Sequence, residues 1–309
     1  MSTFEDSFRT WRRRLKASLP YVRRRELRVL QRKYAELIEA IDVKASPASD
    51  AALLWIKAFP AELEGDVCLF VTFADEPRIK PHALEHLAAL VAARVRVVVI
   101  VNTDVAVDRL AIDGALLERA SGVVIRQNIG FDFGAWAHVL TFCGDTTRWT
   151  RLFLVNDSIV GPLNESDFAR LLERIRNSGA DVIGLTEALA PLRHLQSYFL
   201  VFGARALQGG AVRRIFGRMR NWPTKVQVID VCETRLTALF EAEGLRCEAL
   251  FPSLSGDPRS SDDTSVRWAE LVRQGFPYLK TRVIAAHPHD PRIKAWLAAR
   301  PGATPPPSS

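Results

Sequence analysis

Residues 95–101 read VRVVVIV, a short run of β-branched side chains interrupted by one arginine. A second apolar run, VCLFVTF, occupies residues 67–73. Continuous apolar runs of this length are typical of strands that are buried on both faces, as in parallel sheets. Between them, residues 81–94 carry apolar side chains at helical spacing and begin with Pro81, which suits the first turn of a helix. These segments therefore predict a strand–helix–strand unit.

The same alternation continues as far as residue 202. Further strands are predicted at residues 122–126, 151–155, 181–185 and 198–202. Helices are predicted at residues 107–120, 133–142 and 167–177. Strands that alternate with helices favour an α/β fold with a mostly parallel sheet flanked by helices. Ligands bind such sheets in the crevice beyond the carboxyl ends of the strands.

The 309 residues are 48% hydrophobic, which is enough for one large domain with an appendage. No run of about 18 apolar residues occurs, so a transmembrane helix is excluded. Residues 1–10 are polar and charged, and we expect no secretory signal. The four cysteines form no CxxC pair, so we expect reduced thiols in a cytoplasmic protein. The chain also lacks GxGxxG and GxxxxGK[ST] sequences, which argues against dehydrogenases and P-loop nucleotidases.

The positive charge is concentrated at the start of the chain. Residues 1–33 contain eleven basic and three acidic side chains, a net +8, whereas the whole chain carries +7. We expect residues 1–45 to form a basic, amphipathic helical arm, residues 46–300 the α/β domain, and the Pro-rich residues 301–309 a disordered tail. The arm either contacts an anionic membrane surface, which would place the protein peripherally on the inner face, or packs on the domain or a partner. Because the body is near neutral, no nucleic-acid partner is expected.

Polar side chains follow four of the predicted strands, at the point where each strand ends. They include Thr72, Asp104, Asn128 and Asp157. Four such ends converging on one edge of a sheet would form a crevice for a polar ligand. Asp157 suits a hard cation such as Mg²⁺ or Mn²⁺, or else an Asx-type turn.

Asp132 follows the third of these strand ends and lies among aromatic residues, in the sequence NIGFDFGAW (128–136). It either caps the helix that follows or contacts a ligand. We favour a ligand contact, because apolar surroundings disfavour a carboxylate unless something donates hydrogen bonds to it.

Five short sequences occur in an order that resembles the rhamnan synthesis protein F family of bacterial surface-polysaccharide pathways. They are NIGFDFGAW (128–136), LVNDS (154–158) with Gly161 and Pro162, GLT (184–186), HLQSYFLVF (194–202) and GFPYLK (275–280). The resemblance spans about residues 66–285, most of the expected domain. It implies a GT-A-like glycosyltransferase that uses a nucleotide-activated sugar, with dTDP-L-rhamnose as the donor that the family name suggests.

In GT-A enzymes, an Asp-x-Asp sequence after the fourth strand binds the metal and the diphosphate. This chain has Asn156, Asp157 and Ser158 there, so the resemblance supplies one carboxylate, Asp157, for Mg²⁺ or Mn²⁺. The residues expected to bind the donor are Thr72, Asp104, Asn128, Asp132, Asn156, Asp157, Ser158 and Lys280.

Sugar transfer also needs a base that takes the proton of the acceptor hydroxyl. Glu233 and Asp230 are candidates, because their spacing places them on neighbouring positions of one helical turn; both are equally consistent with carboxylates that favour a helix start. His194 is a third candidate, although a lone histidine is more often structural.

The expected function is transfer of L-rhamnose or another deoxyhexose from a nucleoside diphosphate to a growing surface polysaccharide. The acceptor would be a glycan or a lipid-linked glycan. The alternative is a non-catalytic module that binds a glycan or a nucleotide sugar within a polysaccharide-assembly complex.

Overall fold

The computed structural model describes residues 45–60, 62–255 and 262–299. The predicted arm, apart from its last residue, and the predicted tail lie outside the described residues. Among the described helices, none is both long enough and apolar enough to cross a membrane.

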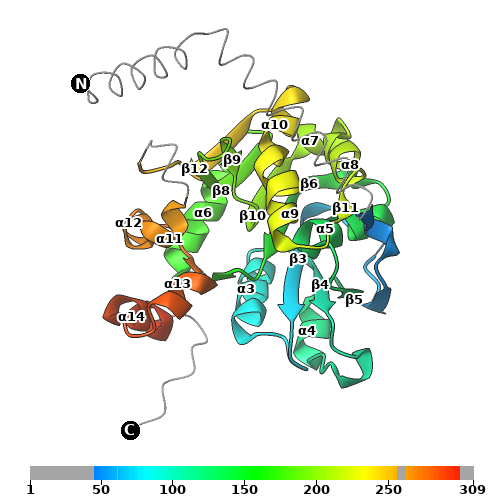
Figure 1. Cartoon of the computed structure of the whole chain (residues 1–309), viewed down its shortest axis with the longest axis horizontal. Coiled ribbons are helices and arrows are strands. Elements are labelled where there is room, and N and C mark those ends of the chain that lie inside the picture. The colour runs from blue at the N-terminus through cyan, green and yellow to red at the C-terminus, as the bar shows by residue number, and fades with distance from the viewer. Residues whose placement is uncertain (1–44, 61, 256–261, 300–309) are drawn as a thin grey trace, which may run out of the picture. The chain divides into compact units, whose positions relative to one another are not determined.

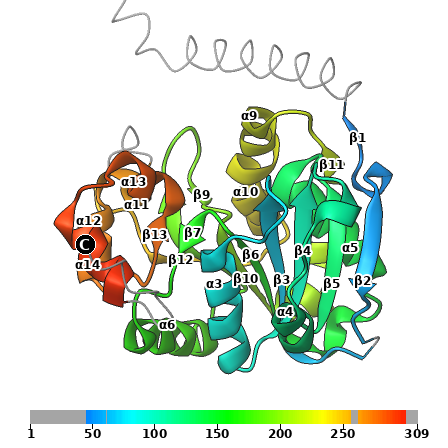
Figure 2. The ribbon, with the colours of Figure 1, turned by 90° about the horizontal axis from the view of Figure 1, so that it is seen from below.

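The centre of the fold is a mixed β-sheet. Its main path runs β12-β8-β10-β6-β3-β4-β5-β2. Pairing is parallel along β6-β3-β4-β5 and between β12 and β8, and antiparallel where β10 meets β6 and β8 and where β2 meets β5. Figure 2 shows β6, β3, β4, β5 and β2 side by side. The strands are β1 (Ser46–Pro47), β2 (Leu53–Lys57), β3 (Gly65–Ala74), β4 (Arg96–Thr103), β5 (Gly122–Gln127), β6 (Trp149–Asn156), β7 (Ile159–Val160), β8 (Val182–Ala188), β9 (His194–Leu195), β10 (Phe199–Gly203), β11 (Arg220–Asn221), β12 (Cys247–Phe251) and β13 (Leu279–Lys280).

Helices cover both faces of this sheet. One face packs on α3, α4 and α6 through alternate strand residues such as Phe70, Val99 and Phe153. Opposite it, Trp136 of α5 donates a hydrogen bond to the carbonyl oxygen of Leu69 in β3 (3.0 Å). The helices are α3 (Pro81–Ala92), α4 (Gly114–Arg119), α5 (Phe131–Phe142), α6 (Glu165–Asn177), α7 (Ala204–Gln208), α8 (Ala211–Phe216), α9 (Lys225–Val228), α10 (Thr234–Ala242), α11 (Asp263–Val266), α12 (Trp268–Arg273), α13 (Thr281–Ala286) and α14 (Pro291–Ala299).

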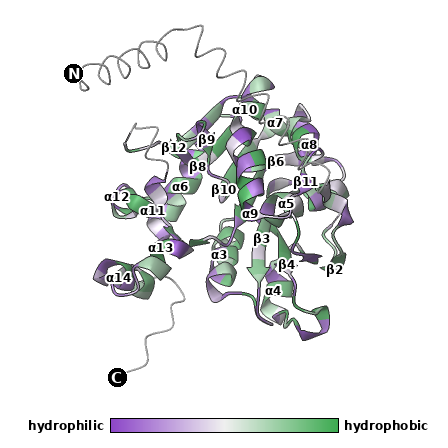
Figure 3. Cartoon of the chain, in the orientation of Figure 1, coloured by the Kyte–Doolittle hydropathy of each residue, from purple (hydrophilic) through white to green (hydrophobic). Residues whose placement is uncertain are grey.

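The core follows from the apolar runs of the sequence. In β3 and β4, the residues from Val67 to Val71 and from Val97 to Val101 are at most 2% exposed. Figure 3 shows these two strands in the colours of apolar residues. Burial of both faces explains why these runs are continuous rather than alternating.

The C-terminal helices form a smaller apolar cluster of their own. Trp268, Val283 and Ile293 pack there against Leu163 and Leu279. Figure 1 shows α11 to α14 gathered beside the sheet domain's α6. The antiparallel pair β7–β13 connects this part to the main sheet, because Lys280 pairs with Ile159.

The α/β prediction is confirmed, and each of the six predicted strands is present with small shifts at its ends. The parallel arrangement holds for β3, β4, β5 and β6, whereas β10, predicted at residues 198–202, runs antiparallel to both neighbours. Residues 189–198 join β8 to β10, and this connection of ten residues already contains β9. A parallel crossover needs a dozen or more residues, so the short connection explains the reversed direction.

Candidate functional site

Asp157 lies just beyond β6, beside the carboxyl end of β3. The two strands are parallel neighbours, and Val71 pairs with Asn156 in the register. Asp157 Oδ2 accepts hydrogen bonds from Thr72 Oγ1 (2.8 Å) and from the backbone N–H of Phe73 (3.0 Å). Strand pairing therefore fixes this carboxylate from two positions of β3.

The start of α3 reaches the same carboxylate. Lys80 Nζ lies 3.3 Å from Asp157 Oδ2. His82 Nε2 lies 3.0 Å from the carbonyl oxygen of Asp157. The Asp157 side chain is only 13% exposed, so the lysine pairs with a largely buried carboxylate.

The turn between β5 and α5 is held by a buried arginine. Arg126 donates hydrogen bonds to the carbonyl oxygens of Gln127 (3.0 Å) and Ile129 (2.7 Å) and to Asn221 Oδ1 (2.7 Å). Burial lowers the pKa of its guanidinium to about 10, so it stays charged at neutral pH. The arginine thus fixes the backbone that leads into α5.

That turn contains two residues with left-handed backbone conformations. Gly130 has φ +71° and Phe131 has φ +52°. A bulky residue in this region costs about 1–3 kcal/mol and persists only where the surroundings hold it. Asn102 at the end of β4 supplies such a contact, because its Nδ2 donates to the carbonyl oxygen of Phe131 (3.2 Å). The strained turn places Asp132 at the beginning of α5.

Asp132 faces the end of β6. Its Oδ2 accepts a hydrogen bond from Asn156 Nδ2 (2.8 Å). The pKa of Asp132 is raised to about 7, mainly by burial and also by the nearby Asp157 and Glu233, whereas Lys225 and the Asn156 hydrogen bond act in the opposite direction. A carboxyl group that titrates near neutral pH in a group of other charges is a candidate for a functional residue.

Glu233 lies at the end of a π-helical turn (Ile229–Glu233) between α9 and α10. Its Oε1 accepts hydrogen bonds from the backbone N–H (2.8 Å) and Oγ (2.9 Å) of Ser197. π-Helical turns are rare and are often found at functional sites. This one brings a carboxylate toward the end of the sheet.

Two lysines complete the group. Lys280 of β13 is half-buried, and its ammonium lies 3.8 Å from the centre of the Tyr198 ring. Burial lowers its pKa to about 8; Lys225 lowers it too, and Glu233 and Asp132 raise it. Lys225 is exposed at the start of α9. Asp132, Asp157, Glu233, Lys225 and Lys280 therefore interact electrostatically, and we call them the strand-end cluster.

The structure brings together most of the residues that the sequence predicts for the site. Thr72 contacts Asp157, and Asn156 contacts Asp132. Ser158 donates from its N–H (3.1 Å) and its hydroxyl (2.7 Å) to Asn156 Oδ1. These contacts join the predicted residues of three different segments.

Four predicted residues are placed differently. Asp104 and Asp230 are exposed, and Asn128 is half-buried and makes no hydrogen bond to a described member of the strand-end cluster. His194 is 6% exposed on β9, and its Nδ1 lies 2.7 Å from the carbonyl oxygen of Leu192. Of the three predicted bases, Glu233 is the one that faces Asp132 and Lys280.

Sequence reasoning missed Lys80, Ser197 and Lys225. Lys80 stands directly before Pro81, so its position at a predicted helix start was a signal for a cation near that strand end. Ser197 precedes a predicted strand, and Lys225 begins a helix whose place in the fold no local pattern reveals.

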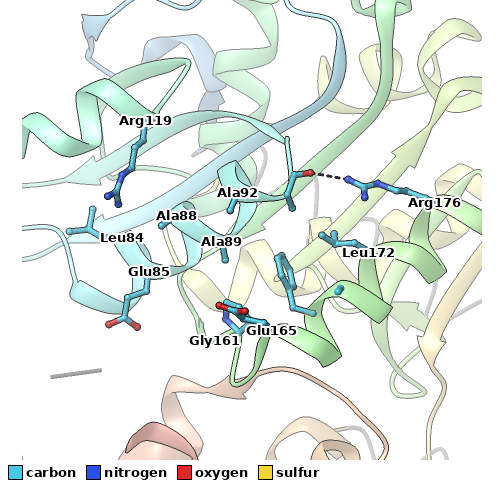
Figure 4. A pocket seen from close by; sticks show the side chains of 14 residues that line it. Leu84, Glu85, Ala88, Ala89, Ala92, Arg119, Gly161, Glu165, Leu172 and Arg176 are labelled. Carbon is cyan, nitrogen blue, oxygen red and sulfur yellow. Dashed lines mark hydrogen bonds between the residues drawn. The ribbon is translucent and has the colours of Figure 1, made fainter. Parts of the chain in front are cut away.

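A separate cavity lies away from the strand-end cluster. It has a volume of about 770 Å³ and lies between α3 and α6. Figure 4 shows Leu84, Ala88, Ala89 and Leu172 along its wall, with Glu85 and Glu165 at one end. Arg176 closes the other end by donating to the carbonyl oxygen of Ala93 (2.9 Å). We call this cavity the α3–α6 groove.

Comparison with known proteins identifies relatives of this chain. The chain is 27% identical over 212 residues to the virulence protein VirA of Vibrio anguillarum, an alignment that covers 57% of this chain and 67% of that protein. It is 28% identical over 134 residues to the uncharacterized protein y4gN of Sinorhizobium fredii, covering 42% of this chain and 34% of that protein.

A family model, rhamnan synthesis protein F, matches residues 97–297. The match spans more than half of the chain and contains every member of the strand-end cluster. The family connects the chain with the synthesis of rhamnan and related polysaccharides. The chain belongs to the rhamnan synthesis protein F family.

Proposed function

We propose that this protein is a glycosyltransferase. In this proposal it moves a deoxyhexose such as L-rhamnose from a nucleoside diphosphate to a growing surface polysaccharide. Membership of a family named for rhamnan synthesis supports the pathway. The strand-end cluster supports the chemistry, because it combines carboxylates with ammonium groups at the carboxyl ends of parallel strands.

The observation that carries the proposal is the meeting of Asp132, Glu233 and Lys280. These residues come from α5, the π-helical turn and β13, yet Glu233 influences the pKa of both Asp132 and Lys280. A carboxyl group and a lysine with shifted pKa values close to a second carboxylate are typical of a binding or catalytic site.

The proposed reaction breaks the bond between the anomeric carbon and the diphosphate oxygen. The electron pair of that bond stays on the diphosphate, and the anomeric carbon forms a new bond to an acceptor hydroxyl. Glu233 takes the hydroxyl proton, while Ser197 holds the other side of its carboxylate in place. Asp132 accepts a hydrogen bond from a sugar hydroxyl, and the lysines stabilise the charge that develops on the leaving diphosphate.

The test is sugar transfer by the purified full chain. dTDP-L-rhamnose is supplied with a lipid-linked glycan acceptor, and released dTDP and extended glycan are both measured. We expect turnover by the unaltered chain and a loss of about 100-fold or more in Asp132→Asn, the size seen when a group that acts on the transition state is removed. Glu118→Gln is the matched control, because Glu118 is exposed on α4, away from the cluster.

Absence of transfer with every donor and acceptor tried would contradict the proposal. If the chain then still bound dTDP-L-rhamnose, the result would support a non-catalytic nucleotide-sugar module instead. The predicted contact of residues 1–45 with an anionic membrane, and a cytoplasmic location, stay predictions that this assay does not address.

A further inference from the structure

The resemblance to GT-A enzymes implies a divalent cation beside Asp157. The atoms around that carboxylate show whether a cation would fit there. Its Oδ2 already accepts hydrogen bonds from Thr72 and from the N–H of Phe73. The ammonium of Lys80 lies 3.3 Å from the same oxygen. A lysine and two hydrogen-bond donors therefore already occupy Oδ2 of this carboxylate.

The neighbouring Asn156 offers no free ligand either. Its Oδ1 accepts two hydrogen bonds from Ser158, and its Nδ2 donates to Asp132. Within the described parts of the chain, no group of three or more histidine, cysteine, aspartate or glutamate side chains is arranged to hold a metal ion. A hard cation prefers several oxygen ligands, and Mg²⁺ is usually bound through carboxylates together with phosphates and water. The side chains around Asp157 and Asn156 therefore do not fit a divalent cation.

Positive charge reaches the site from lysines instead. Lys280 is placed by the β7–β13 pair and rests on the Tyr198 ring. Lys225 is close enough to influence both Lys280 and Asp132. Among the described residues, no carboxylate lies within ion-pair distance of Lys280, so its charge is available to an incoming anion.

We propose that the site binds the diphosphate of its donor without a divalent cation, through the ammonium groups of Lys280 and Lys225. This inference rests on the proposed function and specifies how its donor is held. Lys80 stays on Asp157 and keeps that carboxylate from repelling the diphosphate. Lysine can neutralise phosphate as a point charge, without the fixed geometry that a metal ion requires.

The experiment measures binding of dTDP to the full chain by titration calorimetry. The buffer contains either excess EDTA or added Mn²⁺. We expect the dissociation constants in the two buffers to agree within about twofold. We expect Lys280→Ala to raise the dissociation constant about tenfold or more and Lys225→Ala to raise it severalfold, since hydrogen bonds between charged groups are stronger than those between neutral groups.

Two further variants separate charge from folding. Lys280→Arg keeps the positive charge and should retain more affinity than Lys280→Ala. Lys294→Ala removes an exposed lysine of α14 and should leave the affinity unchanged. The thermal unfolding of each variant is recorded, and Lys225→Ala, at an exposed position, tests the inference even if Lys280→Ala does not fold.

The outcomes are distinct. Binding that disappears in EDTA and returns with Mn²⁺ overturns this inference but leaves the transferase proposal standing. Equal binding by Lys225→Ala, Lys280→Ala and the unaltered chain overturns the assignment to these lysines. No binding of dTDP in either buffer overturns the proposed donor class and, with it, this inference.

Discussion

The strand-end cluster and the α3–α6 groove are close in sequence but differ in chemistry. Both use residues from α3 and from the segment after β6. Lys80 and His82 contact Asp157, whereas Leu84, Ala88 and Ala89 line the groove. The groove is a cavity of about 770 Å³, and its wall is mostly apolar. The cluster instead gathers three carboxylates and two lysines.

The difference shows that a cavity alone does not mark where sugar transfer could take place in this fold. Sugar transfer needs a base and positive charge near the leaving group, and the cluster has both. The groove has two glutamates and two arginines at its ends, separated by a stretch of alanine and leucine. The following substitutions test this contrast, from the largest expected effect to the smallest.

Replacing Glu233 by glutamine should have the largest effect. The amide oxygen can still accept the hydrogen bonds of Ser197, but the side chain can no longer take a proton. We expect kcat to fall about 100-fold or more, the range of general-base catalysis. Affinity for dTDP should not weaken, because a negative charge near the diphosphate has been removed. Steady-state kinetics and dTDP titration measure the two effects, and a weaker dTDP affinity with unchanged kcat would contradict the assigned role.

Substituting Gly130 by alanine should disturb the turn that places Asp132. A Cβ there would lie 2.4 Å from Asn221 Oδ1, and φ is +71°. Strain and this close contact should lower the free energy of unfolding by about 2 kcal/mol, with a loss of donor affinity.

Gly244→Ala is the control for Gly130→Ala. Gly244 has φ +75°, but nothing lies within 4 Å of its added Cβ. This variant should show the backbone strain alone, with donor affinity unchanged. Chemical denaturation and dTDP titration of both variants check the prediction, which equal losses in the two proteins would refute.

Asp132→Asn should change the dependence of stability on pH. The pKa of Asp132 is raised from 3.8 to about 7, so the folded chain binds this proton more tightly than the unfolded chain. Its contribution to stability is therefore fully present below about pH 4 and is lost as the pH rises to about 7. We expect Asp132→Asn to match the unaltered chain near pH 4 and to melt about 2–4 °C higher near pH 8, the shift that about 1 kcal/mol gives in a domain of this size. A Tm difference that does not change with pH would show that the fold does not raise the pKa of the Asp132 carboxyl group.

Ala89→Leu should have the smallest effect. The added methyl groups enter the α3–α6 groove, where Ala89 is half-buried. We expect dTDP affinity within about twofold and stability within about 0.5 kcal/mol of the unaltered chain, as is usual for substitutions away from special features. A large loss of dTDP affinity would show that the groove belongs to the donor site, so that the groove and the strand-end cluster would not be separate.

The apolar runs predicted the central strands because burial on both faces leaves a continuous hydrophobic sequence. The direction of β10 was not predictable from its own residues, because it depends on the short connection that precedes it. The edge strand β2 was not predicted, because its sequence LLWIK does not alternate in polarity although its side chains alternate between half-buried and exposed. The ends of β3 and β6 bring Thr72, Asn156 and Asp157 together, as their sequence positions suggested. Asp104 is exposed, and its sequence position did not show this, because alternation along a strand does not reveal where the chain turns after it ends.

The β7–β13 pair determines when the donor site can form during synthesis of the chain. The N–H of Thr281 donates to the carbonyl oxygen of Ser158 (2.9 Å), joining positions 123 residues apart in the chain. Lys280, next to Thr281, therefore reaches Asp132 and Glu233 only after nearly the whole described chain has been synthesised. A nascent protein that already contains β2 to β6 would still lack this cation, so donor binding should mature late, as one of the last events of assembly on the ribosome.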